Sequence, residues 1–154
     1  LVSHVQVWTR DYGLTLDPDY QRGHVWTQAQ QIAYVEHILR GGEVGKNLIL
    51  NSKGWNDGTS TIVEVVDGKQ RLTTMLGFVQ DGFRIFHETV PGGVTCTELG
   101  GPPPRRFGFK WRVVDLDRIG ILKLYLSLNG GGTQHTPEEL DRVRALLAAE
   151  LAKP

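Results

Sequence analysis

The segment VEVVDGKQRLTT, residues 63–74, constrains the fold of this 154-residue chain more than any other part. Its first half is a valine-rich apolar run, which is typical of a buried strand, and Asp67-Gly68 ends that run. Apolar residues then recur at helical spacing, in a stripe of Leu72, Met75, Leu76 and Val79. The sequence therefore predicts a strand that turns through one glycine directly into a helix.

The rest of the chain interleaves further strands and helices. Apolar patterns predict strands at 4–8, 47–51, 83–90 and 105–114, and the turn cluster at 53–60 predicts a hairpin into 61–67. Capping boxes begin helices at Thr27/Gln30 and at Thr136/Glu139, and helical spacing marks 117–128 and 137–152. Because the order is not a strict βαβ repeat, we expect an α+β fold: a mixed β-sheet with flanking helices and a helical C-terminal part.

Composition excludes several classes of protein. The 17 basic and 17 acidic residues balance, so a nucleic-acid contact would have to come from a local patch. Cys96 is the single cysteine, which rules out an internal disulfide and favours a reducing, cytoplasmic setting. The five histidines lack the spacing of a zinc site, and no apolar run is long enough to span a bilayer.

The turn at Asp67-Gly68 has the clearest chemical logic. A helix N-terminus attracts anions, because its first N–H groups lack partners and the helix dipole is positive there. Lys69 and Arg71 are cations in that first turn, where they cost roughly 0.3–1 kcal/mol unless an anion compensates. A phosphate would be such an anion. The alternative, that Asp67 caps the helix and the cations are solvated, stays open.

Three other clusters are candidates for ligand contacts. Gln21-Arg22 offers planar donors suited to phosphate, whereas the nearby Trp26 is more typical of a core residue. The glycine run after Asn129 is either an anion-binding nest or, more simply, a linker. The third cluster places basic groups among aromatic residues, a pattern that suits DNA: Arg105, Arg106, Lys110 and Arg112. Its aromatic residues are expected in the core.

These pieces occur in one order: YQRGHVW, a helix, a hairpin, VVDGKQRLTT and NGGGTQHTPEEL. The order and the two motifs resemble the N-terminal (DGQQR) domain of the GmrSD-type restriction endonucleases, which is related to the ParB/sulfiredoxin fold. The resemblance covers residues 16–140, roughly. It implies a domain that binds, and often hydrolyses, nucleoside triphosphates with Mg²⁺, and that regulates a nuclease domain or a separate nuclease subunit.

The resemblance also implies site residues. Asp67, Gln70 and Arg71 would be catalytic, with Asp67 as the contact to Mg²⁺. The nucleotide and its phosphates would be bound by Gln21, Arg22, Gly68, Lys69, Thr73, Thr74 and Asn129. Lys69 stands where the family usually has glutamine, which adds a cation. We expect one domain over 1–154, with 117–154 as a helical extension and no nuclease domain.

Two alternatives remain open at this stage. The chain could be a non-catalytic, nucleotide-gated module that binds DNA or protein, as ParB relatives are. It could also be a ParB-fold phosphotransferase. Sulfiredoxin uses a catalytic cysteine, but Cys96 lies in a glycine-rich loop away from both motifs, which makes that chemistry improbable here.

Overall fold

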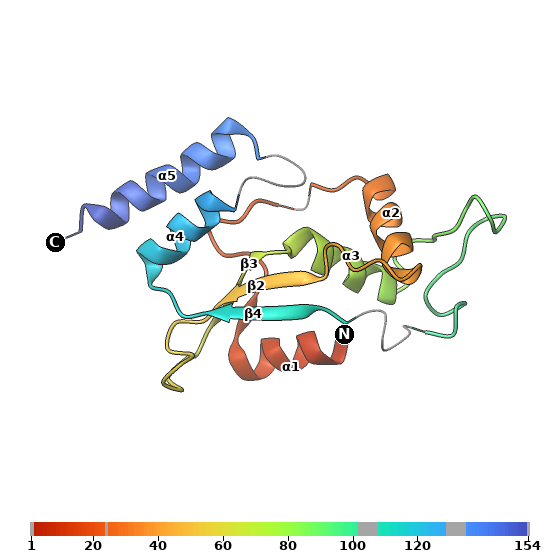
Figure 1. Ribbon diagram of the computed structural model, residues 1–154, viewed down its shortest axis with the longest axis horizontal. Coiled ribbons are helices and arrows are strands. Elements are labelled where there is room, and N and C mark those ends of the chain that lie inside the picture. Colours follow the sequence, from red (N-terminus) through yellow and green to blue (C-terminus); the bar gives the residue numbers. More distant parts are fainter. Residues whose placement is uncertain (1, 24, 102–107, 129–134, 154) are drawn as a thin grey trace.

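The computed structural model describes residues 2–23, 25–101, 108–128 and 135–153, apart from the side chains of residues 2–4 and 6. A four-stranded mixed sheet with the order β1-β3-β2-β4 forms its centre (Figure 1). Strands β2 and β3 are antiparallel, whereas β1 runs parallel to β3 and β4 runs parallel to β2. Along the chain, the elements are α1 (Val2–Tyr12), β1 (Leu14–Thr15), α2 (Gln28–Leu39), β2 (Asn47–Asn51), β3 (Val63–Asp67), α3 (Lys69–Val79), β4 (Lys110–Val114), α4 (Arg118–Ser127) and α5 (Pro137–Leu151).

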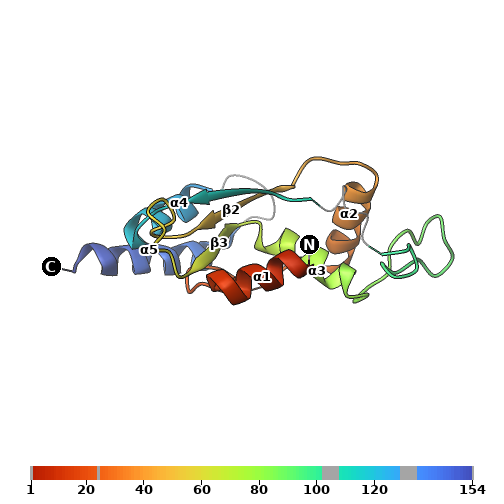
Figure 2. The same cartoon turned by 90° about the horizontal axis from the view of Figure 1, so that it is seen from below.

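Helices cover both faces of the sheet, because its central strands are apolar on both sides. One face of β2 and β3 packs with α1 and α3, through residues such as Leu48, Val65 and Leu72 (Figure 2). The opposite face carries Ile49 and Val66, which pack with α4 and α5. This arrangement confirms the predicted α+β fold, and it leaves the β3–α3 turn between two groups of helices.

A third cluster lies beyond the end of the sheet. Helices α2 and α3 pack there with the segment 83–96 around Phe78, Ile85 and the buried Cys96. Burial raises the pKa of the Cys96 thiol, and Asp81 adds to the effect. The thiol therefore belongs to the core and does not line the pocket formed by the motifs.

The predicted strand at 4–8 is wrong, because these residues belong to α1. The apolar side chains that dock this helix are Val5 and Trp8, which pack on the sheet, and Tyr12, whose ring lies 5.5 Å from that of Trp8. Their spacing of three and four residues is helical. The strand was predicted from residues 4–8 alone, in which apolar and polar residues alternate, so the helical spacing to Tyr12 was not considered.

The predicted strand at 83–90 is also wrong. Ile85 makes a single bridge to Val94, and Phe86 has a φ of 60°. The Arg84 side chain donates to the carbonyls of Gly92 (2.8 Å) and Gly93 (3.1 Å). Side-chain contacts thus hold this segment as a folded loop in place of a strand ladder.

The predicted capping boxes, hairpin and C-terminal helices are confirmed. The strand predicted at 105–114 is confirmed only for Lys110–Val114, because 108–109 are not part of β4 and 105–107 lie outside the described residues. Both capping boxes form, at Thr27/Gln30 and at Thr136/Glu139, and Pro137 lies in the first turn of α5. The hairpin forms between β2 and β3. Across the described residues, no helix combines the length and the apolar character needed to cross a membrane.

Candidate functional site

The β3–α3 turn forms the floor of the candidate site. Gly68 is the N-cap of α3, with a φ of 101°, and among the described residues no side chain caps this helix end. A Cβ atom at Gly68 would lie 2.1 Å from Cδ2 of Leu48, so no other residue fits without displacement. The alternative considered from the sequence, that the Asp67 side chain caps α3, is therefore wrong.

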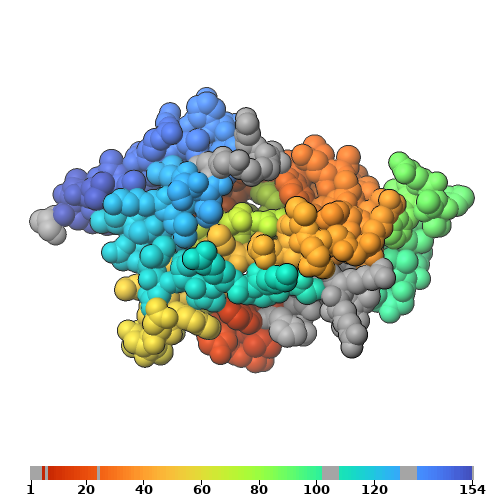
Figure 3. Space-filling model, viewed as in Figure 1, coloured from red at the N-terminus to blue at the C-terminus, as the bar shows by residue number. Residues whose placement is uncertain are grey.

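A pocket of about 490 Å³ opens above this turn. Figure 3 shows it as a depression between the α4 side of the molecule and the α2–β2 side. Its lining comes from four regions that are far apart in sequence: Gln21, Arg22, Trp26, Val44, Gly45, Val66, Asp67, Gly68, Lys69, Gln70, Arg71, Tyr125, Leu128 and His135. Both sequence motifs thus meet in one cavity.

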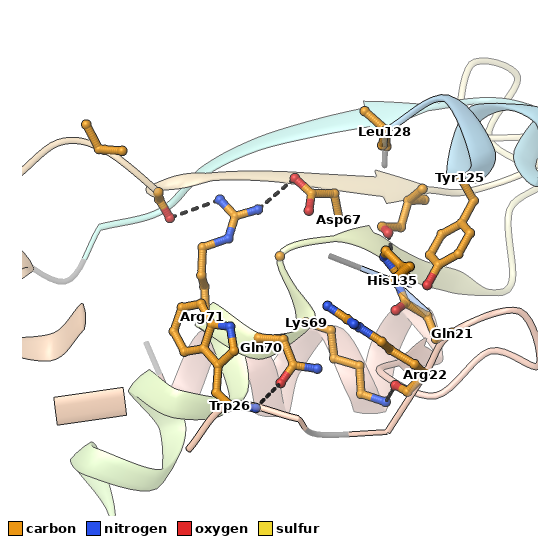
Figure 4. Close-up of a pocket in the computed structure, with 14 residues that line it drawn as sticks. Gln21, Arg22, Trp26, Asp67, Lys69, Gln70, Arg71, Tyr125, Leu128 and His135 are labelled. Atoms are coloured by element: carbon orange, nitrogen blue, oxygen red, sulfur yellow. Dashed lines mark hydrogen bonds and ion pairs between the residues drawn. The ribbon is translucent and has the colours of Figure 1, made fainter. Parts of the chain in front are cut away.

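Arg71 ties the loop before β2 to the end of β3. Its Nη1 donates to the carbonyls of Gly45 (3.1 Å) and Asn47 (2.8 Å), and its Nη2 donates to Oδ2 of Asp67 at 2.6 Å (Figure 4). The Asp67 side chain remains 45% exposed beside this contact. Arg71 therefore builds one wall of the pocket and orients the carboxylate.

Gln70 holds the segment that carries Trp26. Its Oε1 accepts from the backbone N–H groups of Val25 (3.0 Å) and Trp26 (3.4 Å), and its Nε2 donates to the carbonyl of Gly23 at 2.9 Å. Both ends of the amide are used, so Gln70 fixes the segment that leads into α2.

Gln21 attaches an earlier part of the same segment to β3. Its Nε2 donates to the carbonyls of Val65 and Val66, each at 2.8 Å. These carbonyls lie at the end of β3, so the YQR segment is attached directly to the strand that leads into the site.

Lys69 is buried and points below the pocket floor. Its Nζ contacts the Asp17 carboxylate and donates to the carbonyl of Arg22 at 2.6 Å. The anion that compensates this cation is therefore Asp17, where the sequence had suggested a phosphate.

The C-terminal helix α5 is attached to the YQR segment beside the pocket. Nη1 of Arg22 lies 3.3 Å from Oε2 of Glu139, and Nη2 of Arg142 donates to the carbonyl of Gln21 at 2.7 Å. Burial tends to raise the pKa of Glu139, but the backbone N–H of Thr136 and the charge of Arg22 lower it below the usual value. The carboxylate is therefore ionised, and α5 is attached to the YQR segment at two points.

Aromatic rings stand at the two ends of the cavity. Trp26, expected in the core, lines the pocket and meets Tyr34 edge to face at 5.3 Å. At the other end, Tyr125 meets His135 edge to face at 5.4 Å. Burial and the Arg22 charge lower the pKa of His135, although Glu139 opposes them, so its ring is neutral at neutral pH.

A family model for the GmrSD restriction endonuclease N-terminal domain matches residues 7–144, nearly the whole chain. The protein belongs to this family. Its mixed sheet with flanking helices is consistent with the ParB/sulfiredoxin-like label. Membership in the GmrSD N-terminal domain family connects the chain with DNA restriction. Searches of curated proteins and of solved structures found no match.

In this GmrSD N-terminal domain, most residues predicted from the motifs meet in the pocket: Gln21, Arg22, Asp67, Gly68, Lys69, Gln70 and Arg71. Their chemical roles remain predictions. Thr73 and Thr74 do not line the pocket, because they lie further along α3, where Thr74 is buried. Asn129, Arg105 and Arg106 lie outside the described residues. Lys110 and Arg112 are exposed on β4, and the proposal that they contact DNA stays a prediction.

Sequence reasoning missed two groups of pocket residues. Val44 and Gly45 reach the pocket because Arg71 binds the Gly45 carbonyl, and nothing in the sequence marks that contact. Tyr125 comes from α4, and His135 comes from the residues just before α5, where its place next to the capping box was the available signal. The GmrSD site is therefore built jointly by the motifs and the helical extension.

Proposed function

We propose that this pocket binds a nucleoside triphosphate and that the domain acts in DNA restriction as a nucleotide-binding unit. The observation that carries the proposal is the α3 N-terminus without a side-chain cap, which opens into a cavity of about 490 Å³. Backbone N–H groups at such an end favour phosphate oxygens. The cavity also falls within the roughly 300–1,000 Å³ typical of small-molecule sites.

The rim of the pocket suits the rest of a nucleotide. Trp26 lines one end and Tyr125 the other, and aromatic rings of this kind stack on bases. Arg22 lies on the same wall as Tyr125 and supplies positive charge toward the phosphates. The ligand would therefore place its phosphates near Gly68 and its base toward one of the rings.

Asp67 suits a metal that arrives with the ligand. Among the described residues, no group of three or more His, Cys, Asp or Glu side chains could hold a metal by itself. Mg²⁺ commonly uses one or two carboxylates together with substrate phosphates. Asp67, partly exposed beside Arg71, would supply that carboxylate, and bound Mg²⁺ would neutralise phosphate charge.

A specific observation also favours a second candidate, a module that binds nucleotide without hydrolysing it. The side chains of Lys69, Gln70 and Arg71 hold backbone carbonyls of neighbouring segments. Three residues of the DGKQR motif therefore have a structural role that is independent of hydrolysis. Release of phosphate separates the two candidates.

The decisive experiment is a thermal-unfolding panel of nucleoside triphosphates with and without Mg²⁺, together with an assay for phosphate release. At a ligand concentration of 100 times Kd, we expect about 2.7 kcal/mol of stabilisation. Asp67→Asn should remove the Mg²⁺-dependent part of the shift and any phosphate release, whereas Arg22→Ala should weaken binding.

The matched control is Asp141→Asn, which breaks an exposed Asp–Arg pair on α5 that lies one turn apart like Asp67–Arg71. It should behave as wild type. Absence of stabilisation by every triphosphate would overturn the proposal, and binding without phosphate release would select the non-catalytic candidate.

A further inference from the structure

Every cation that lines the pocket is paired with a carboxylate. Arg71 contacts Asp67, Lys69 contacts Asp17, and Arg22 contacts Glu139. A phosphate that enters the pocket therefore meets cations that already have anionic partners. For an arginine or lysine side chain to bind the phosphate strongly, one of these pairs has to change.

The Arg22–Glu139 pair is the one that can change most easily. Its separation of 3.3 Å is the longest of the three, against 2.6 Å for Arg71–Asp67. Arg22 has its guanidinium on the pocket wall, where a second anion can reach it.

Glu139 keeps a hydrogen bond if Arg22 turns toward a ligand. Its Oε2 accepts from the backbone N–H of Thr136 at 2.9 Å, as the capping box of α5 requires. The carboxylate would stay hydrogen-bonded, so the exchange would not leave a buried charge alone. The second attachment of α5, from Arg142 to Gln21, would also remain.

We propose that Glu139 is a built-in competitor of the pocket ligand: its carboxylate binds Arg22 in the empty protein, and a phosphate-bearing ligand displaces it. This rests on the proposed function and adds a regulatory residue to the same pocket. Because binding free energies are reciprocal, a ligand that takes Arg22 weakens the hold of α5 on the YQR segment by the same factor. Occupancy of the pocket is thereby coupled to the C-terminal helix.

Glu139→Gln tests the competition. Either Glu or Gln can complete a capping box at this position, so the substitution keeps the helix cap. It removes the negative charge that neutralises Arg22. With inorganic tripolyphosphate as the probe, calorimetry should show binding that is about fivefold tighter or more, a factor typical of coupled sites. A residue that only supported the fold would give weaker binding when substituted.

Glu138→Gln is the matched control. Glu138 lies one residue away in the same first turn of α5, and it is exposed and does not line the pocket. Its substitution removes the same charge and should change the Kd for tripolyphosphate by less than about twofold, since exposed charges are well screened. Thermal unfolding of both variants checks that α5 remains folded.

Equal or weaker binding by Glu139→Gln than by wild type would overturn the inference. If triphosphates stabilise the wild type while this result is found, the proposed function stands and the competition fails. If no nucleotide binds but Glu139→Gln still tightens tripolyphosphate binding, the competition stands and the proposed function fails. If neither protein binds tripolyphosphate, the inference fails as well.

Discussion

Gly68 has a structural reason to be glycine that is independent of any ligand. Its φ of 101° is a conformation that L side chains rarely adopt, and a Cβ would collide with the fully buried Leu48. The sequence suggested that this glycine lets phosphates approach. The structure adds that any other residue at this turn would be strained and would displace Leu48, so the site and the fold both depend on Gly68.

Gly68→Ala should therefore lower the free energy of unfolding by about 3 kcal/mol, from backbone strain and overpacking together. Urea unfolding measures the loss. Gly41→Ala is the control, because Gly41 has a similar φ of 94° but no atom within 4 Å of its would-be Cβ. It should cost only about 1 kcal/mol, from backbone strain alone. Equal losses would mean that the Leu48 contact is relieved by repacking.

At the same scale, the sequence predicted which motif residues meet but not what they bind. Gln21, Arg22 and Arg71 do share one pocket. The partner of Lys69, in contrast, is Asp17, more than 50 residues earlier in the chain. Such a contact depends on how the YQR segment crosses the end of β3, and no local pattern encodes that crossing.

Among the elements, predictions succeeded where the sequence contained a helix-capping motif or a long stretch of apolar residues at helical spacing. The α2 and α5 capping boxes were predicted to the residue, because their hydrogen bonds are local. The strands at 4–8 and 83–90 failed for tertiary reasons. Val5 and Trp8 dock a helix against the sheet, and Arg84 satisfies the carbonyls of Gly92 and Gly93.

Helix α5 is the element whose attachment can be tested most directly. Arg142 donates to the Gln21 carbonyl, whereas Arg144 on the same helix forms its ion pair with the exposed Asp141. Arg142→Ala should speed amide hydrogen exchange along α5 by about tenfold, since a hydrogen bond from a charged donor contributes roughly 1.5–3 kcal/mol, and α4 still packs against the helix.

Arg144→Ala supplies the comparison in the same exchange experiment. It should leave α5 as protected as in wild type, because an exposed ion pair contributes little. If both variants exchange alike, the packing of Val143 and its neighbours on α4 holds the helix without the contact to the YQR segment.

For the whole molecule, interleaved strands and helices were enough to predict an α+β fold with a mixed sheet. The strand order β1-β3-β2-β4 was not predictable, because β4 joins the sheet after a crossover of about forty residues past β3. The apolar run of β3 was predicted to be a buried strand, and the structure buries it on both faces, with Val63 and Val65 on one and Val66 on the other. The pocket lies where helices from those two faces meet.

The pairing of the three pocket cations bears on how quickly a ligand arrives. A wall whose charges are already matched produces a weak field beyond its surface, so it does little to steer an incoming anion. The association rate constant for tripolyphosphate should therefore change little between low and physiological ionic strength in stopped-flow mixing, unlike electrostatically steered encounters. Capture in this domain would be governed by how long Arg22 stays with the ligand once it has arrived.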